Sequence, residues 1–404
     1  MTGRPAEQDF DRWLDSDRAA RPARLERLRE RLEREGVDAY FGVRRENTRY
    51  LTGFELAEGE EKSAGSSGQF FVSADEVVVL ADSRYLAQAN DDCPSARIER
   101  VYHDFGERWP ALIGSLRPVR SNGGNGTVRR VAVEAGFVSH ATWSRLAAAS
   151  PGVELVPAEG WVEEARATKE PSEIERVAAA CAVADAALER LLPKIVPGVT
   201  EGELAIQLEW DIRTSGAEAL AFDVACLSGP RAALPHGKPG DRAVSEGEVI
   251  LFDFGAQVCG YRSDMTRTLF VGQPTDRDRQ VYELVLRSQQ AAIDAVAAAA
   301  QSGDRPPGRA IDTISRQVIT EAGFGEHYGH GLGHGIGLAT HELPSLTYSG
   351  PSVPLPGPTV FTIEPGVYLD GQTGVRIEDV VLFDPAARRF ERLTTFPREL
   401  TVVG

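Results

Sequence analysis

Two aspartates stand in a stretch whose other residues predict buried strands. Asp253 lies in the run VILFDFGA, and Asp264 lies eleven residues later in YRSDMTRT. A carboxylate among Val, Ile, Leu and Phe is costly to bury unless it is paired or binds a metal. A hairpin centred on Val258 and Cys259 would place the two aspartates opposite each other, where like charges need a cation. A solvated edge pair, or a salt bridge to a nearby arginine, explains these two residues alone equally well.

The glycine-rich segment HYGHGLGHGIGLATHE concentrates histidines. Five of the chain's seven histidines lie between positions 236 and 341. Glycines at alternate positions disfavour a regular helix and let the backbone approach a ligand closely. An isolated histidine is more often a hydrogen-bonded core residue than a metal ligand, but a group of four within a glycine-rich segment favours binding or catalysis. The four are His327, His330, His334 and His341.

Two glutamates complete a candidate metal site. Glu364 in VFTIEPGVY and Glu378 in GVRIEDVVLF each lie in a pattern typical of a buried strand. With Asp253, Asp264 and His334 they supply four carboxylates and one imidazole, a hard ligand set suited to manganese, with cobalt and zinc as alternatives. Four negative charges would roughly neutralise two divalent cations. This balance favours a dinuclear site in which a shared water becomes a hydroxide nucleophile.

The elements that must position these residues follow from the patterning of the second half of the chain. Pro171 opens a long helix whose apolar residues recur at three- and four-residue steps. Thr200 and Glu203 form a capping box that opens a second helix, which should end near Gly216. Further helices alternate with strands, which predicts an α/β or α+β domain with a largely antiparallel sheet. The helices are expected at 276–300 and 310–322, and the strands at 249–254, 265–271, 360–364 and 375–383.

The first part of the chain has a different pattern. Short β-rich runs alternate with helical stretches such as 21–35, which predicts a smaller α/β domain. The polar segment 166–170 before Pro171 marks the boundary, so we expect domains at 1–165 and 166–404. The β-rich runs are at 39–43, 69–72 and 76–80, and Gly/Ser/Asn clusters at 63–68 and 121–127 predict exposed loops.

Composition excludes several classes of protein. The chain has 404 residues, 42% hydrophobic and 26% charged, as in ordinary globular proteins. Its 44 basic and 60 acidic residues give a charge of -16, which disfavours nucleic acid and anionic membranes as partners. It contains no apolar run long enough to span a membrane and no signal-peptide pattern, so we expect a cytoplasmic protein. The four cysteines show no CxxC spacing and are expected to be reduced core thiols.

These residues resemble the pita-bread metallopeptidases, which include methionine aminopeptidase, Xaa-Pro aminopeptidase, Xaa-Pro dipeptidase (prolidase) and creatinase. The resemblance covers the whole C-terminal half, and the run ENTRYLTGF at 46–54 is similar to the creatinase/prolidase-type N-terminal domain. It implies a C-terminal pita-bread domain preceded by that smaller α/β domain. The C-terminal motifs are LPHG at 234–237, DFG at 253–255, SDMTRT at 263–268, HGLGHGIG at 330–337, HE at 341–342, TIEPG at 362–366 and RIED at 376–379.

The resemblance also implies a division of labour among the ligands. It implies that Asp253 binds one metal ion, that His334 and Glu364 bind the other, and that Asp264 and Glu378 bridge both. It further implies that Glu364 acts as the proton shuttle for the attacking water, a role that requires hydrogen-bond reach of the proton.

Other residues are implied to contact the substrate. By resemblance, His236 and His341 flank the scissile peptide and stabilise the charge that develops on it. His330 and Arg376 correspond to the proline side of the site. For Arg376, a salt bridge that orients one of the carboxylates is an equally good interpretation, and His327 is interpreted as a support residue of its loop.

The expected activity is that of a metal-dependent exopeptidase acting on short proline-containing peptides. Relatives that lost the metal ligands, such as creatinase and histone chaperones, are disfavoured because all four acids are present. Methionine aminopeptidase lacks so large an N-terminal domain. Xaa-Pro aminopeptidase is the expectation, Xaa-Pro dipeptidase is the alternative, and a non-catalytic peptide- or protein-binding protein is a remote one. The resemblance also implies a homodimer or larger homo-oligomer.

Overall fold

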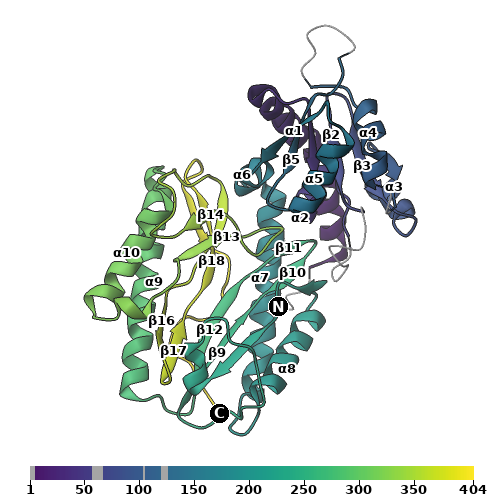
Figure 1. The fold of residues 1–404 in the computed structure, drawn as a ribbon. Helices are drawn as coiled ribbons and strands as arrows, with labels where there is room; N and C mark the ends of the chain where they lie inside the picture. The colour runs from purple at the N-terminus through teal and green to yellow at the C-terminus, as the bar shows by residue number, and fades with distance from the viewer. Residues whose placement is uncertain (1–4, 57–66, 103–104, 120–125) are drawn as a thin grey trace. The chain divides into compact units, whose positions relative to one another are not determined.

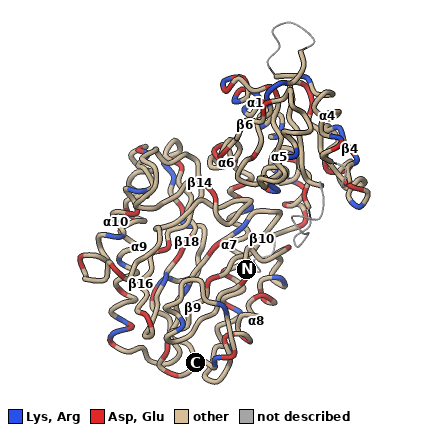
Figure 2. Tube along the Cα trace, in the orientation of Figure 1, with Lys and Arg blue, Asp and Glu red and all other residues tan. Residues whose placement is uncertain are grey.

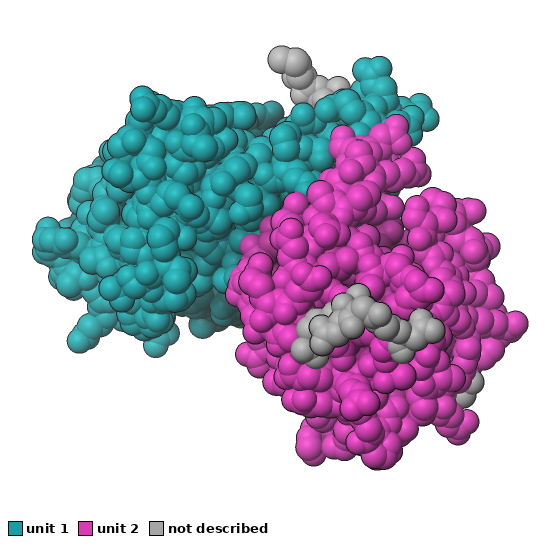
Figure 3. Space-filling model, turned by 90° about the horizontal axis from the view of Figure 1, so that it is seen from above, with its two compact units in different colours: residues 1–13, 166–404 teal, residues 14–165 magenta. Residues whose placement is uncertain are grey.

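The computed structural model describes residues 5–56, 67–102, 105–119 and 126–404 (Figure 1). The chain forms two compact units: the first unit, residues 14–165 (magenta in Figure 3), and the second unit, residues 1–13 with 166–404 (teal). The start of the first helix, α1 (Glu7–Glu35), belongs to the second unit, where Trp13 is buried and donates a hydrogen bond to Glu175 at 2.9 Å. Of the loops expected at 63–68 and 121–127, residues 63–66 and 121–125 lie outside the described residues.

The unit formed by residues 14–165 is an α/β domain, as predicted. Its sheet has the strand order β4-β3-β2-β1-β5-β6, in which β1 is antiparallel to β2 and parallel to β5. Phe41, Phe71 and Trp109 pack together in its core. The strands are β1 (Ala39–Gly42), β2 (Phe70–Val72), β3 (Val77–Ala81), β4 (Arg97–Arg100), β5 (Arg130–Glu134) and β6 (Glu154–Ala158). The helices after α1 are α2 (Arg45–Thr52), α3 (Leu86–Asp92), α4 (Phe105–Ser115), α5 (His140–Ala149) and α6 (Trp161–Ala167), the last of which continues into the second unit.

The helices of the second unit match the sequence prediction. The helix expected after Pro171 is α7 (Pro171–Leu191), and its predicted apolar stripe packs inward. The capping box forms at the start of α8 (Glu201–Thr214), where Thr200 Oγ1 accepts from the Glu203 amide at 3.2 Å. The pairs α7 with α8 and α9 with α10 lie side by side (Figure 1). The bounds of the other helices are α9 (Asp276–Ser302), α10 (Gly308–Glu321), and the short 3-10 helices η1 (Leu192–Lys194), η2 (Gly229–Ala233) and η3 (Gly325–His327).

The strands of this unit are largely antiparallel, as expected. They form sheets in the orders β20-β12-β9-β8, β14-β13-β15-β18-β19 and β11-β10-β7, together with the pair β16-β17. Only β12 with β20 is parallel among the described pairs of this unit. The strands are β7 (Ala219–Leu220), β8 (Ala225–Ser228), β9 (Glu248–Phe254), β10 (Ala256–Val258), β11 (Tyr261–Arg262), β12 (Met265–Val271), β13 (Gly333–Gly335), β14 (Glu342–Leu346), β15 (Thr359–Ile363), β16 (Gly366–Leu369), β17 (Thr373–Arg376), β18 (Asp379–Asp384), β19 (Arg389–Arg392) and β20 (Val402–Val403).

The hairpin between the two aspartates has a different centre from the one predicted. Val258 pairs with Tyr261, so Cys259 and Gly260 form the turn, with φ of 46° and 79°. A two-residue hairpin turn needs positive φ at both positions, which a β-branched valine resists and glycine accepts. In the resulting register Asp253 lies opposite Thr266 rather than opposite Asp264.

The strand expected at 375–383 is two strands, β17 and β18, separated at Ile377 and Glu378. Glu364 likewise follows β15 rather than lying within it. Both glutamates therefore stand at strand ends, where the backbone can turn a side chain out of the sheet pattern.

Charged residues of both signs are distributed along both units (Figure 2). Within the described part of the chain, no helix is long and apolar enough to cross a membrane. The four cysteines are buried free thiols, as expected.

Candidate active site

A cavity of about 700 Å³ in the second unit collects almost all of the predicted site residues. Its walls come from the β8–β9 connection, from β9, from the start of β12, from the glycine-rich segment, and from the ends of β15 and β17. His327 is not among its lining residues: it is exposed and packs on Phe324. The predicted residues that line the cavity are His236, Asp253, Asp264, His330, His334, His341, Glu364, Arg376 and Glu378.

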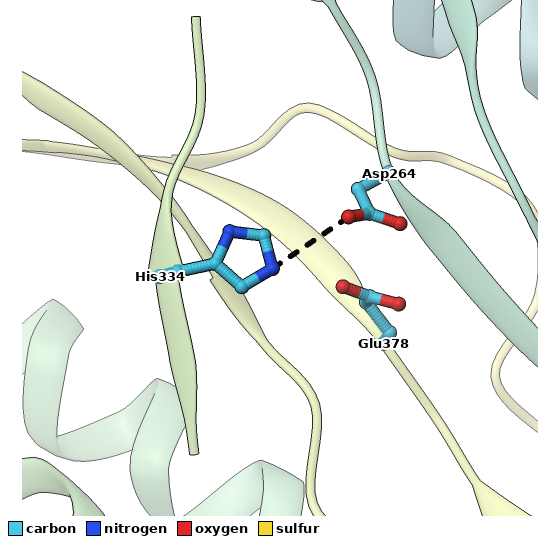
Figure 4. Close-up of side chains that lie close together, drawn as sticks. All are labelled: Asp264, His334 and Glu378. Atoms are coloured by element: carbon cyan, nitrogen blue, oxygen red, sulfur yellow. Dashed lines mark ion pairs between the residues drawn. The ribbon is translucent and has the colours of Figure 1, made fainter. Parts of the chain in front are cut away.

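Three of the predicted metal ligands converge most closely (Figure 4). One ligand atom from each of Asp264, His334 and Glu378 lies within 4.8 Å of the others. Asp264 immediately precedes β12, His334 is the middle residue of β13, and Glu378 immediately precedes β18. Each therefore sits on, or next to, a strand that fixes its backbone.

His334 presents a lone pair to two carboxylates. Its Nδ1 lies 3.1 Å from the carbonyl of Gly335, which can only accept, so Nδ1 carries the proton. The unprotonated Nε2 then faces Glu364 Oε1 at 3.3 Å and Asp264 Oδ2 at 3.6 Å. A lone pair directed at two carboxylate oxygens is repulsive unless a cation or a carboxyl proton lies among them.

The carboxylates crowd one another in a buried space. Burial, and after it the charges of Glu378 and Asp253, raise the pKa of Asp264 well above its ordinary value. Burial and neighbouring acids raise the pKa of Glu378 in the same way. Burial also raises the pKa of Glu364 to about 7. Without added positive charge, these acids cannot all be ionised together near neutral pH.

Arg376 is the buried cation of the site. It forms a salt bridge with Asp253 Oδ2, and its Nε donates to Thr266 Oγ1 at 2.9 Å. Its Nη1 donates to the Tyr368 hydroxyl at 2.8 Å. Of the two interpretations of Arg376, the salt bridge that orients a carboxylate is therefore present.

Thr266 and Tyr368 belong to the site, although sequence reasoning missed both. The Thr266 hydroxyl donates to Glu378 Oε2 at 2.7 Å. Thr266 lies two residues after Asp264 on the same strand face, so strand alternation could have found it. Tyr368 follows Glu364 by four residues and lies just beyond the TIEPG motif at 362–366, but no residue pattern there indicates a contact with Arg376.

The ring of His330 is fixed by two contacts. Its Nδ1 lies 2.8 Å from the carbonyl of Gly331 and its Nε2 lies 2.9 Å from the hydroxyl of Tyr368. Because the carbonyl accepts from Nδ1, the tyrosine hydroxyl donates to Nε2. Burial lowers the pKa of His330 to about 4, so the ring is neutral near pH 7.

The other two predicted substrate histidines are more open. His341 is exposed at the cavity wall, with its ring 4.2 Å from that of His334 between centroids. Burial of its imidazole lowers the pKa of His341 to about 4, so it too is neutral near pH 7. His236 is exposed on the connection between η2 and β9.

Comparison with known proteins places this site in a family. The model of metallopeptidase family M24 matches residues 175–385, and the creatinase/prolidase N-terminal domain matches residues 24–168. An Xaa-Pro dipeptidase from Pyrococcus furiosus is 31% identical over 380 residues, which are 93% of this chain and 99% of that protein. The chain belongs to metallopeptidase family M24.

Solved structures agree with this membership of family M24. An Xaa-Pro dipeptidase from Bacillus anthracis matches with a TM-score of 0.82 and 32% identity, covering 94% of this chain and 99% of that one. An X-Pro aminopeptidase from Thermotoga maritima matches with a TM-score of 0.80 and 33% identity, with the same coverage. The protein is thus a peptide-bond hydrolase with the pita-bread fold, as the motifs predicted.

The residues present fit the divalent ions that a metallopeptidase of family M24 requires. Asp253 Oδ1 and Glu378 Oε1 are buried and have no hydrogen-bond partner within the described part of the chain. Buried carboxylate oxygens without a donor are costly unless a cation satisfies them. The inward lone pair of His334 makes the same demand, so the donor set matches a metal site on the chemistry of its own atoms.

Proposed function

We propose that the protein is an Xaa-Pro dipeptidase that uses two divalent metal ions, with manganese as the metal. The observation that carries the proposal is the cavity that gathers four carboxylates and the inward-facing His334 beside three further histidines. The hard oxygen ligands favour manganese.

The comparisons support the dipeptidase over the aminopeptidase expected from the sequence. The full-length Pyrococcus relative is an Xaa-Pro dipeptidase, and so is the Bacillus anthracis structure with a TM-score of 0.82. Prolidase structures from two further archaea match as well, one with a TM-score of 0.81 and 28% identity, the other with 0.82 and 26%. The sequence-based preference for an aminopeptidase rested on the run SGPRAALPHG at 228–237, which resembles short bacterial enzymes often assigned that activity.

Five residues would hold the metal ions: Asp253, Asp264, His334, Glu364 and Glu378. Bound there, two divalent ions would lower the pKa of a water molecule and polarise the scissile carbonyl. Four carboxylates balance the charge of two such ions.

The chain's own groups would carry the proton and hold the peptide. Glu364, at the cavity wall, would take the proton of the attacking water on its carboxylate, because a general base must lie within hydrogen-bond reach of the proton it takes. The rings of His236 and His341 would donate to the scissile peptide as charge develops on it. Arg376 would hold the side chains of Asp253 and Tyr368 in place, and Tyr368 in turn contacts His330.

Xaa-Pro aminopeptidase is the second candidate. The Thermotoga maritima structure, with a TM-score of 0.80 and 33% identity, is an X-Pro aminopeptidase and favours it. The two activities share the reaction at the peptide bond before proline. They differ in whether the chain continues beyond the proline.

Peptides of matched composition distinguish the two activities. Metal-stripped protein restored with manganese is incubated with Ala-Pro, with Ala-Pro-Pro and with Met-Ala as a control. The proposal predicts that Ala-Pro is hydrolysed and that the other two are cleaved at least about tenfold more slowly. Faster cleavage of Ala-Pro-Pro would establish the aminopeptidase, and cleavage of Met-Ala alone would contradict both.

A further inference from the structure

No residue of the segment that carries His236, residues 234–243, is itself buried in the core. Every residue from 234 to 243 is exposed or half-buried, and Leu234 leaves 43% of its surface in solvent. Within the described residues, no hydrogen bond holds the His236 ring. The position of His236 therefore depends on whatever fixes the backbone of its segment.

One buried carboxylate accepts hydrogen bonds from residues on both sides of His236. Glu201, the first residue of α8, is fully buried. Its Oε1 accepts from the amide and the hydroxyl of Ser228, at 2.8 and 2.9 Å. Its Oε2 accepts from Arg231 Nε at 2.9 Å and from the amide of Gly240 at 3.3 Å. Ser228 and Arg231 precede His236, whereas Gly240 follows it.

The backbone at the start of α8 adds to this anchor. The amide of Glu201 donates to the carbonyl of Arg242 at 3.0 Å, and the amide of Gly202 donates to the carbonyl of Gly240 at 3.0 Å. Arg231 also donates to the carbonyl of Lys238. Residues before and after His236 are thus hydrogen-bonded to the start of α8. The capping box at Thr200 fixes that end of the helix.

We propose that Glu201 is a positioning residue that holds the exposed His236 in place for catalysis. The proposal rests on the proposed function, because His236 is assigned to the scissile peptide there. Glu201 does not line the cavity and acts only through the segment that it anchors. A displacement of about 1 Å at a catalytic group can lower a rate about 100-fold.

The substitution Glu201→Gln tests the proposal while keeping the side chain's size. The introduced amide NH₂ would face an N–H of Arg231, Ser228 or Gly240, so part of the anchor becomes a contact between two donors. We expect kcat/KM for Ala-Pro to fall between about 10- and 100-fold, with bound manganese unchanged. Amides of residues 234–243 should exchange their hydrogens faster.

A double-mutant cycle separates positioning from general structural damage. If Glu201 acts through His236, then Glu201→Gln should lower activity less than about twofold in a His236→Ala background. An equal loss in both backgrounds would overturn the proposal. If Glu201→Gln does not fold, the same cycle is run with Arg231→Ala, which removes one contact of Glu201 at a partly exposed side chain.

The matched control is Asp185→Asn. Asp185 is a buried carboxylate of the same unit that accepts from the amide and hydroxyl of Thr395 and from the amide of Phe396. It has no hydrogen bond to residues 228–240 among those described. We expect lower stability, unchanged exchange at 234–243 and unchanged kcat/KM.

Hydrogen exchange tests the positioning role of Glu201 independently of the proposed function. If the natural protein hydrolyses no Xaa-Pro peptide, the proposed function fails, and faster exchange at 234–243 in Glu201→Gln would still establish the anchor. Unchanged exchange in that variant would overturn the positioning role whatever the activity. An active His236→Ala variant would remove the assignment of His236 on its own.

Discussion

At the scale of single residues, the site is defined by charges that cannot be satisfied by the chain alone. Asp253 Oδ1 and Glu378 Oε1 are buried without partners in the described part of the protein, and Arg376 forms a salt bridge with Asp253, one of the proposed metal ligands. The lone pair on His334 Nε2, which faces Asp264 and Glu364, adds to the need for positive charge in the site. Divalent cations resolve all three features at once.

The substitution Asp264→Asn should remove one charge from the metal site. We expect manganese affinity to fall by more than about 100-fold, because even partners of metal ligands contribute about 10–100-fold. Hydrolysis of Ala-Pro should disappear at micromolar manganese. Metal content measured after dialysis checks this, and full activity with unaltered metal content would contradict the assignment.

The substitution His341→Ala should separate catalysis from metal binding. Loss of one donor to the developing charge typically lowers kcat by about 100- to 1,000-fold. Bound manganese should stay unchanged, because the ring lies outside the ligand cluster. His327→Ala is the matched control, since that exposed histidine lies outside the cavity and should leave kcat unchanged. Metal loss in His341→Ala would show that a ligand was misassigned.

Sequence patterns identified the carboxylates but not the residues that hold them. Asp253 and Glu378 stood out because acids are rare in apolar runs. Thr266 and Tyr368 are ordinary residues of a strand, and their contacts with Glu378 and Arg376 join residues 112 and 8 positions apart in the chain. The first contact depends on how β12 lies beside the segment between β17 and β18, and the second on the pairing of β16 with β17, neither of which composition and spacing encode.

At the scale of elements, glycines let strands approach where the ligands sit. A Cβ on Gly333 would lie 2.1 Å from the carbonyl oxygen of Thr362, so β13 can lie this close to β15 only with glycine there. Gly333 directly precedes His334, and Thr362 Oγ1 accepts from the His334 amide at 3.1 Å. The strand pair thus fixes the histidine against Glu364.

The substitution Gly333→Ala should push β13 away from β15. We expect a loss of about 1–3 kcal/mol in the free energy of unfolding, typical of overpacking, together with weaker manganese binding. Gly329→Ala, in the same glycine-rich segment, has open space at its Cβ and should change neither property. Chemical denaturation and metal titration check the pair. Equal behaviour of the two variants would contradict the close-approach argument.

The helices were easier to predict than the hairpin and the strand breaks. Periodic apolar residues and a capping box located α7 and α8 to within a few residues, because both signals are local. The hairpin register depended on which residues accept positive φ, and the one-residue error moved Asp253 from Asp264 to Thr266. The break before Glu378 has no local signal.

At the scale of the whole molecule, the proposed metal site lowers the stability of the folded protein when no metal is bound. The raised pKa values of Glu364, Asp264 and Glu378 mean that the folded protein without metal holds protons that the unfolded chain releases. Such groups lower stability as pH rises from the unfolded pKa, about 4.5 for Glu, through the folded one. Bound cations remove the penalty because they favour the ionised carboxylates.

Stabilisation by manganese should therefore increase with pH. The difference in Tm between loaded and stripped protein should grow from pH 5 to pH 7.5, with Glu364 alone contributing on the order of 3 kcal/mol. The rings of His330 and His341, whose pKa values are lowered to about 4, affect both forms alike and cancel in the difference. Differential scanning calorimetry across this range checks the prediction. A pH-independent difference would contradict it.

The division of the whole chain was predictable only in part. The change in pattern near residue 165 separated two α/β regions, and the two family models match residues 24–168 and 175–385. The start of α1 packs with the second unit through Trp13 and Glu175, a contact across about 160 residues of chain. No local pattern in residues 5–13 indicates that partner.

The most direct test of the account is a metal titration of the stripped protein followed by hydrolysis of Ala-Pro. The account predicts no hydrolysis without metal and activity that rises with added manganese until two equivalents are bound per chain. Hydrolysis by fully stripped protein, or full activity with a single bound equivalent, would contradict a site built from four carboxylates and His334 for two cations.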